Sequence, residues 1–252
     1  MDSDFITALA PDGKAYARAF SVFLAHTDQK DQACSFLWEV IEQLSDHRVF
    51  LDAGAGNGRV TQGFTDAFEH TIAIEPSAHL RDELARACPS ATIMPSTILG
   101  ASPDLRASFV LCSHVLYHVP TDRWPAHLHR MLGWLDHEGE LAIILQNPES
   151  DCMQMVHHFT GSQFDIAELL RGLRDGPDGE RYTVAVETVP STIQTPDVDT
   201  AMIIAGFMLN HLSRRPPLRR DDVRAYVQRV FGDAAGRCSF TCTQDFLRVR
   251  RK

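Results

Sequence analysis

Hydrophobic residues change their spacing in a regular order along this chain. At 13–27 and at 31–44 they recur every three or four positions, which predicts two amphipathic helices. From residue 48 onward, short apolar runs alternate with segments of helical spacing. The runs predict strands at 48–53, 70–75, 91–94, 108–113 and 140–146, and the segments between them predict helices that begin at Gly58, cover 77–87 and contain Trp124 to Leu135. This alternation predicts an α/β fold, in which helices cover both faces of a mostly parallel sheet.

The last part of the chain departs from that alternation. It predicts a helix at 151–173, a strand at 181–189, helices at 198–212 and 221–231, and a closing strand at 238–249. Helices placed between the last two strands do not belong to the sheet. We therefore expect one sheet domain, residues 1–190 with 236–252, and a small helical cap inserted at 191–235. The helices within residues 1–46 are expected to form a lid.

Composition and charge exclude several classes of protein. The chain has 252 residues, of which 44% are hydrophobic and 23% charged, as in an ordinary globular domain. Its formal net charge of -9 argues against a nucleic-acid partner, because neutralising phosphates requires a basic face. No apolar run reaches membrane-spanning length, and the N-terminus carries no secretory signal. We expect a soluble, cytoplasmic protein that is a monomer or a homodimer and has no membrane partner.

The cysteines and histidines do not form a metal-binding pattern. The six cysteines include no C-x-x-C pair, so neither a zinc site nor a redox motif is indicated. Two histidine pairs, His127 with His129 and His157 with His158, lack an accompanying carboxylate cluster. We expect no metal site and cysteines that stay reduced in a reducing compartment.

The stretch VFLDAGAGNGRVT at 49–61 is the first sign of a ligand site. A buried strand ends at Asp52, and glycines then occupy alternate positions at Gly54, Gly56 and Gly58. Alternate glycines remove the side chains that would keep a ligand away from the main chain. The dinucleotide fingerprint would need a third glycine where Arg59 stands, and the phosphate loop that ends in Gly-Lys-Ser/Thr is absent. A nicotinamide-dependent oxidoreductase is therefore disfavoured.

A second strand adds a carboxylate to this site. The segment HTIAIE at 70–75 ends in Glu75, which Pro76 follows. A carboxylate at the tip of the second strand of such a sheet can accept hydrogen bonds from both hydroxyls of a ribose. The glycine loop and Glu75 together predict a nucleoside-containing ligand.

The motif D-x-G-x-G-x-G at 52–58, followed by this acid, resembles the first motif of the class I methyltransferases that bind S-adenosylmethionine. Three further segments resemble histamine N-methyltransferases: YARAFSVFLAHT at 16–27, IEPSAHL at 74–80 and VLYHVPTDRWPAHLHRML at 115–132. The resemblance implies a Rossmann-like class I methyltransferase sheet, mostly parallel and seven-stranded, with helices on both faces and a small helical substrate cap. It also implies that S-adenosylmethionine is the cofactor.

The same resemblance implies roles for individual residues. Those expected at the cofactor are Asp52, Gly54, Ala55, Gly56, Glu75, Pro76, Ser96, Thr97 and Ser113. Those expected beside the transferred methyl group, as catalytic candidates, are His114, Tyr117 and His118. Those expected to bind the substrate are Tyr16, Phe20, Asp28, Gln29, Phe207 and Cys242.

The chain departs from the family pattern at the positions that contact the acceptor. Gln29 stands where the family has an acid for the cationic end of its amine, although Asp28 precedes it. His114 replaces a glutamine, His118 a tyrosine and Cys242 an asparagine. Because such contacts choose the substrate, the acceptor need not be histamine.

These departures leave three functions open. The first is methyl transfer to a small-molecule acceptor, an amine nitrogen, by in-line displacement. The second is methylation of an oxygen or a carboxylate on a secondary metabolite, and the third is a cofactor-binding module without catalysis. An imidazole titrates near neutral pH, so His114 or His118 can take the acceptor's proton, or both can simply orient the substrate.

Overall fold

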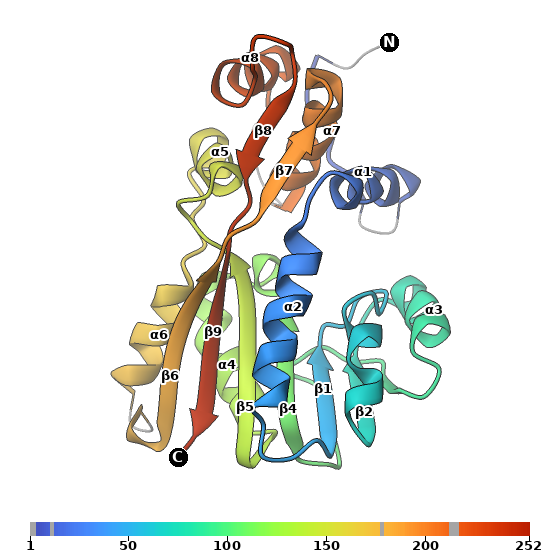
Figure 1. The fold of residues 1–252 in the computed structure, drawn as a ribbon, viewed down its shortest axis with the longest axis vertical. Coiled ribbons are helices and arrows are strands. Elements are labelled where there is room, and N and C mark those ends of the chain that lie inside the picture. Colours follow the sequence, from blue (N-terminus) through green and yellow to red (C-terminus); the bar gives the residue numbers. More distant parts are fainter. Residues whose placement is uncertain (1–3, 11–12, 177–178, 212–216) are drawn as a thin grey trace. The chain divides into compact units, whose positions relative to one another are not determined.

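The computed structural model describes residues 4–10, 13–176, 179–211 and 217–252, and the chain divides into two compact units (Figure 1). Unit 1 comprises Met1–Gln32, Gln146–Phe164 and Val189–Gln244, and unit 2 comprises Ala33–Leu145, Asp165–Thr188 and Asp245–Lys252. This division differs from the domain boundaries expected at 190 and 236, because residues 1–32 and 146–164 group with the segment expected to form the cap.

Unit 2 is built on a seven-stranded sheet with the order β3-β2-β1-β4-β5-β9-β6. In chain order its strands are β1 (Val49–Ala53), β2 (His70–Ile74), β3 (Thr92–Met94), β4 (Ala107–Ser113), β5 (Leu135–Gln146), β6 (Tyr182–Val189) and β9 (Gln244–Arg251). The pairs β1–β2, β2–β3, β1–β4 and β4–β5 are parallel. Figure 1 shows β9 running opposite to β1, so the sheet is mixed but mostly parallel, which confirms the predicted sheet.

Helices lie on both faces of this sheet, α2 on the near face and α4 on the far face in Figure 1. The helices of the chain are α1 (Lys14–Ala25), α2 (Gln29–Glu42), α3 (Ala78–Ala87), α4 (Trp124–Leu132), α5 (Asp151–Thr160), α6 (Ile166–Arg174), α7 (Val198–Met208) and α8 (Arg220–Val230). None of the helices in the described ranges is both long and apolar enough to cross a bilayer.

Aromatic packing holds the centre of unit 2 together. Every residue of β1 is buried, as expected for a central strand covered on both faces. The Phe50 ring lies 5.5 Å from that of Phe68, 5.9 Å from that of Phe109 and 6.1 Å from that of Phe64, measured between centroids. Ring pairs at such distances add to the stabilisation that burial itself provides. This cluster fixes β1 and β4, the two strands that flank the site described below.

The helix expected to begin at Gly58 is absent, and that prediction was wrong. Two short 3-10 turns, η1 (Thr61–Gly63) and η2 (Thr65–Ala67), occupy its place. The segment combines β-branched residues with Gly63, all poor helix formers. The Thr61 hydroxyl also donates a hydrogen bond of 2.7 Å to the buried Asp52 carboxylate, which ties the chain to the end of β1. Tertiary anchoring thus outweighs the helical spacing in the sequence.

Two other expected elements are each divided in the structure. The helix expected at 151–173 ends at Gly161, which has a φ of +67°, and α6 starts anew where the Asp165 carboxylate accepts a hydrogen bond from the Ala167 N–H at 2.8 Å. The strand expected at 238–249 is two strands, β8 (Cys238–Thr241) and β9. Strand β7 (Thr192–Thr195) was missed, because four residues are too short for a clear alternating pattern.

Unit 1 combines helices with a two-stranded ribbon, in which β7 pairs antiparallel to β8. The N-terminal segment is held beside the start of α8: the Ile6 N–H donates to the Leu218 carbonyl and the Arg220 N–H to the Asp4 carbonyl. The helix expected at 198–212 appears as α7 followed by a 3-10 turn, Leu209–His211, and Leu212 lies outside the described residues. The predicted helices at 13–27, 31–44 and 221–231 are confirmed as α1, α2 and α8.

Candidate functional site

The sheet order creates a natural ligand position at the carboxyl end of β1. Strand β2 lies on one side of β1 and β4 on the other, so the connections leave β1 and β4 in opposite directions. Ligands of open α/β sheets bind at such a switch point, beyond the carboxyl ends of the strands. The glycine loop follows β1, Glu75 follows β2, and Ser113 ends β4. The fold therefore gathers the sequence-predicted cofactor residues along one edge.

Both oxygens of the Glu75 carboxylate are held by main-chain groups. The Gly56 N–H donates to one oxygen at 2.9 Å, and the Ser77 N–H donates to the other at 2.7 Å. Glu75 is 6% exposed. An ionised carboxylate has about four acceptor positions, so two of them remain after these two bonds. Glu75 can thus accept two more hydrogen bonds without releasing the glycine loop.

The glycine loop itself fits a ligand that touches main chain. Gly56 has a φ of +58°, and a Cβ built there would meet no atom within 4 Å, so the loop is open on that side. Gly54 has a φ of +94°, and a Cβ built there would lie 2.5 Å from the Val115 Cγ2 atom. Gly54 is therefore required by packing, and the space beside Gly56 remains for a nucleoside.

Replacing Gly54 with alanine is expected to destabilise unit 2 by about 1–3 kcal/mol, because the new methyl group overpacks against Val115 at an unfavourable positive φ. Thermal unfolding measures this loss. Gly63→Ala is the matched control, since a Cβ there meets nothing within 4 Å and its φ is not positive. Equal melting temperatures for the two variants would contradict the packing role of Gly54.

The other residues expected at the cofactor occupy the same edge. Ala55 lies in the loop, where its N–H donates to the Ile74 carbonyl at 3.0 Å. Pro76 is exposed directly after Glu75. Beyond β3, Ser96 is half-buried and its hydroxyl donates to the Thr97 carbonyl at 3.1 Å. The remaining cofactor candidate, Asp52, is 2% exposed and accepts a hydrogen bond from Thr61, so it connects the two ends of the glycine loop.

His114 follows β4 in a left-handed conformation, with a φ of +58°. Among the residues that the structure describes, it is the one non-glycine residue with a positive φ. Such backbone geometry is costly and tends to occur at functional sites. The His114 ring stacks on that of Tyr117 at an interplanar angle of 18°, with centroids 6.0 Å apart. The strain therefore orients an imidazole at the carboxyl end of β4.

His118 lies at the end of the turn Leu116–His118, in the same unit. Desolvation by the surrounding protein lowers the pKa of His118, and the negative charge of Glu75 opposes part of that shift. The residue nevertheless keeps exposed surface. A lowered pKa keeps the imidazole neutral at pH 7, the form that accepts a proton. The Glu75 carboxylate, a cofactor candidate, thus acts on the protonation of the His118 imidazole, a catalytic candidate.

The substrate candidates all belong to unit 1, and three of them form one aromatic cluster. The Phe207 ring of α7 lies 5.3 Å from the Tyr16 ring and 5.6 Å from the Phe20 ring of α1. Phe23 completes the cluster at 5.6 Å from Phe207. Burial raises the pKa of the Tyr16 hydroxyl, which therefore stays protonated. The cluster thus combines two buried rings, Phe23 and Phe207, with two half-buried rings, Tyr16 and Phe20, and one neutral hydroxyl.

The other substrate candidates gather around the segment that leads into β7. One Asp28 oxygen accepts a hydrogen bond from the Thr192 N–H at 2.7 Å. The Gln29 amide donates to the Cys242 carbonyl at 3.1 Å, and the Cys242 thiol lies 3.2 Å from the Thr27 hydroxyl. Gln29 is 2% exposed and Cys242 is 0% exposed, whereas Asp28 is half-buried. Asp28 is therefore the most accessible of the three.

Some features of the site had no clear signal in the sequence. Arg81 donates a hydrogen bond to the Glu75 carbonyl, and Thr61 donates one to Asp52. Both residues fall in segments that the sequence predicts to be helical, and nothing in the sequence distinguishes them from their neighbours there. The left-handed backbone of His114 follows a strand with no glycine to announce it. The acid followed by proline at 75–76 is the one local hint that this turn is fixed.

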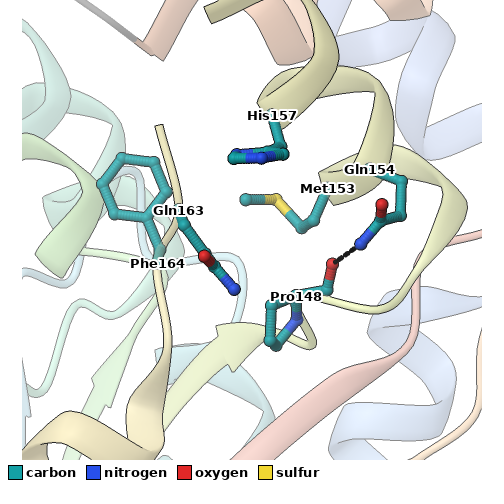
Figure 2. A pocket seen from close by; sticks show the side chains of 6 residues that line it. All are labelled: Pro148, Met153, Gln154, His157, Gln163 and Phe164. Atoms are coloured by element: carbon teal, nitrogen blue, oxygen red, sulfur yellow. Dashed lines mark hydrogen bonds between the residues drawn. The ribbon is translucent and has the colours of Figure 1, made fainter. Parts of the chain in front are cut away.

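A separate hollow of about 190 Å³ lies in unit 1. Figure 2 shows the side chains that line it: Pro148, Met153, Gln154, His157, Gln163 and Phe164. The Gln154 amide donates to the Pro148 carbonyl at 2.9 Å. The hollow contains no predicted site residue. Across the described ranges, no group of three or more His, Cys, Asp or Glu side chains is arranged to hold a metal ion.

Comparison with known families gives one match over most of the chain. A family profile described as a methyltransferase domain matches residues 5–182. A comparison with curated protein sequences found no match.

Solved structures share the fold at low sequence identity. A provisionally named methyltransferase from Bacillus halodurans is 12% identical, with a TM-score of 0.63 over 86% of this chain and 97% of that one. Magnesium protoporphyrin IX methyltransferase from Synechocystis, with bound S-adenosylmethionine, is 14% identical, with a TM-score of 0.52 over 89% and 79%. The N-methyltransferase NodS from Bradyrhizobium japonicum, in complex with S-adenosyl-L-homocysteine, is 12% identical, with a TM-score of 0.51 over 94% and 85%. These likenesses confirm the Rossmann-like fold.

Proposed function

Since the chain belongs to the methyltransferase-domain family, we propose that it transfers the methyl group of S-adenosylmethionine to the nitrogen of a small amine. The class I methyltransferase family and its cofactor, S-adenosylmethionine, agree with the sequence-based prediction. The finer resemblance to histamine N-methyltransferases stays a prediction, because no comparison singles out those enzymes.

The observation that carries the cofactor assignment is the Glu75 carboxylate beside the glycine loop. Its oxygens retain two free acceptor positions after the bonds from Gly56 and Ser77, one for each ribose hydroxyl. The open side of Gly56 leaves room for the nucleoside against the main chain. When bound, S-adenosylmethionine supplies a methyl group that its sulfonium already activates. The protein must therefore orient the acceptor and exclude water more than it must activate the donor.

The acceptor remains a proposal, supported by the chemistry of unit 1. Aromatic rings attract cations, and the half-buried rings of Tyr16 and Phe20, which pack on the buried ring of Phe207, keep some exposed surface. Asp28, in the same unit, can pair with a cationic nitrogen through the oxygen that does not accept from Thr192. The formal net charge of -9 also favours a cationic acceptor over an anionic one.

A protonated amine has no lone pair, so the acceptor must lose a proton before it reacts. His118 is our candidate base, because its lowered pKa keeps its imidazole neutral at pH 7. His114 and Tyr117, stacked at the carboxyl end of β4, are proposed to orient the acceptor.

Methylation of an oxygen is the second candidate function, and one observation favours it. At the position where the resemblance places an amine-holding acid, Gln29 is neutral, 2% exposed and bonded to the Cys242 carbonyl. A neutral phenol or alcohol needs no acid there, and a neutral His118 can remove its proton. A panel of amines, phenols and carboxylic acids, assayed for S-adenosylhomocysteine formation, separates the two functions.

Asp28→Asn is expected to raise the KM for a cationic amine about 10-fold, because a hydrogen-bonded charge pair is lost. The asparagine oxygen can still accept from the Thr192 N–H, so the local fold is retained. Steady-state kinetics with saturating S-adenosylmethionine measure the change. Asp31→Asn, an exposed acid two positions into α2, is the control. Equal KM values for both variants would remove Asp28 from the acceptor site.

A further inference from the structure

Arg81, in the first turns of α3, folds back onto the strand end that precedes it. Its Nη1 atom donates to the Glu75 carbonyl at 3.0 Å and to the Pro76 carbonyl at 2.6 Å. Arg81 is half-buried. One guanidinium nitrogen therefore joins two consecutive carbonyl groups in the turn between β2 and α3.

The same turn fixes the Glu75 side chain from the other direction. The Ser77 N–H donates to a Glu75 oxygen, and the Ser77 side chain caps α3 by accepting from the Leu80 N–H at 3.5 Å. The N–H of Glu75 itself donates to the Met94 carbonyl of β3 at 3.1 Å. Two bonds thus hold the backbone of Glu75, one from its N–H to Met94 and one to its carbonyl from Arg81, and the Ser77 N–H holds its carboxylate.

We propose that Arg81 is a positioning residue for cofactor binding, which acts by holding the turn at 75–77 so that the Glu75 carboxylate is preset for the ribose hydroxyls. This inference rests on the proposed cofactor role of Glu75. Arg81 bonds main-chain oxygens and not the Glu75 carboxylate, so it leaves the two free acceptor positions untouched. Because the guanidinium donor is charged, each of these two hydrogen bonds is about twice as strong as a bond between neutral groups.

A lysine cannot reproduce this arrangement fully. The Nη1 atom that makes both bonds belongs to a planar, rigid guanidinium, whereas a lysine ammonium can donate to the same carbonyls but is a point charge on a flexible stem, so it orders the turn less. Arg81→Lys is therefore expected to keep the fold but hold the turn less firmly. Arg81→Met removes the donors and keeps the apolar stem of the side chain.

The affinity for S-adenosylhomocysteine, measured by titration calorimetry, tests the proposal without any turnover. Arg81→Met is expected to weaken it about 10-fold and Arg81→Lys about 3-fold, because a preset hydrogen-bonding carboxylate loses its fixed position. The kcat at saturating cofactor should change little in either variant. Arg86→Met is the control, since Arg86 is exposed and donates to the Asp82 carbonyl of its own helix at 2.9 Å.

A double-mutant cycle with Glu75→Gln separates positioning from general stability. If Arg81 acts through Glu75, adding Arg81→Met to Glu75→Gln weakens binding by less than about 2-fold, since coupled residues are not additive. Additive losses, or unchanged affinity in Arg81→Met and Arg81→Lys, would overturn the proposal. Unchanged affinity in Glu75→Gln alone would instead overturn the cofactor assignment itself.

Discussion

Glu75→Ala is expected to weaken binding of S-adenosylmethionine by about 10- to 100-fold, because two hydrogen bonds to a charged acceptor are lost. The variant also removes the acceptor of the Gly56 N–H, so the glycine loop loses its tie to the end of β2. Titration calorimetry of the purified protein measures the affinity directly. Both losses act on cofactor binding and neither on the acceptor, so the KM for acceptor should change little.

Two further variants make this result specific. Glu75→Gln keeps the volume of the side chain and one carbonyl oxygen, and is expected to bind the cofactor more tightly than Glu75→Ala. Glu69→Ala removes an exposed acid from the same unit and should bind like the unmodified protein. Wild-type affinity in Glu75→Ala, with its fold intact by circular dichroism, would remove Glu75 from the site.

His118→Ala is expected to lower kcat by about 100-fold or more, the usual contribution of a general base. Cofactor affinity should be retained within about 3-fold, since His118 is a candidate base for the acceptor and is not among the residues expected at the cofactor. His137→Ala, an exposed histidine of the same unit, is the control. Loss of folding in His118→Ala, without a selective loss of turnover, would indicate a structural role.

The pH dependence of the reaction distinguishes a base from a residue that only orients substrate. Because desolvation lowers the pKa of His118, kcat/KM should fall only as the pH drops below the ordinary histidine range, where the ring takes up a proton. Glu75 raises this pKa, so Glu75→Gln should move the acidic limb to lower pH still. A profile that Glu75→Gln leaves in place, or that persists in His118→Ala, would show that another group titrates.

Local sequence patterns predicted the parts of the site that strands position. The apolar run that ends at Asp52 and the run that ends at Glu75 are short buried strands, so their ends fall at one edge of a parallel sheet. The alternating glycines after Asp52 predicted an open loop, and the packing of Gly54 against Val115 explains one of them. The glycine loop and the acid could therefore be located without the structure.

Features that depend on distant contacts could not be predicted in this way. The spacing after Gly58 favours a helix, but the bond from Thr61 to Asp52 and the burial of Phe64 impose 3-10 turns instead. The division into two units depends on contacts such as that of Phe23 with Phe207, far apart in sequence. The left-handed backbone of His114 and the bonds of Arg81 are likewise properties of the folded chain alone.

The acceptor is the part of the function that the sequence leaves most open. Tyr16, Phe20 and Phe207 lie together, but aromatic rings suit amines and phenols alike, so their role in binding the acceptor stays a prediction. Asp28 carries the preference for an amine, while the buried Gln29 and Cys242 give that preference no further support.

Formation of S-adenosylhomocysteine from S-adenosylmethionine, followed for the purified protein with separate panels of amines, phenols and carboxylic acids, shows which class of acceptor the protein methylates. We predict turnover with cationic amines, absent without acceptor and strongly reduced in both Glu75→Ala and His118→Ala. Turnover confined to phenols or carboxylic acids, or cofactor binding with no turnover on any acceptor, would contradict the proposed amine methyltransferase.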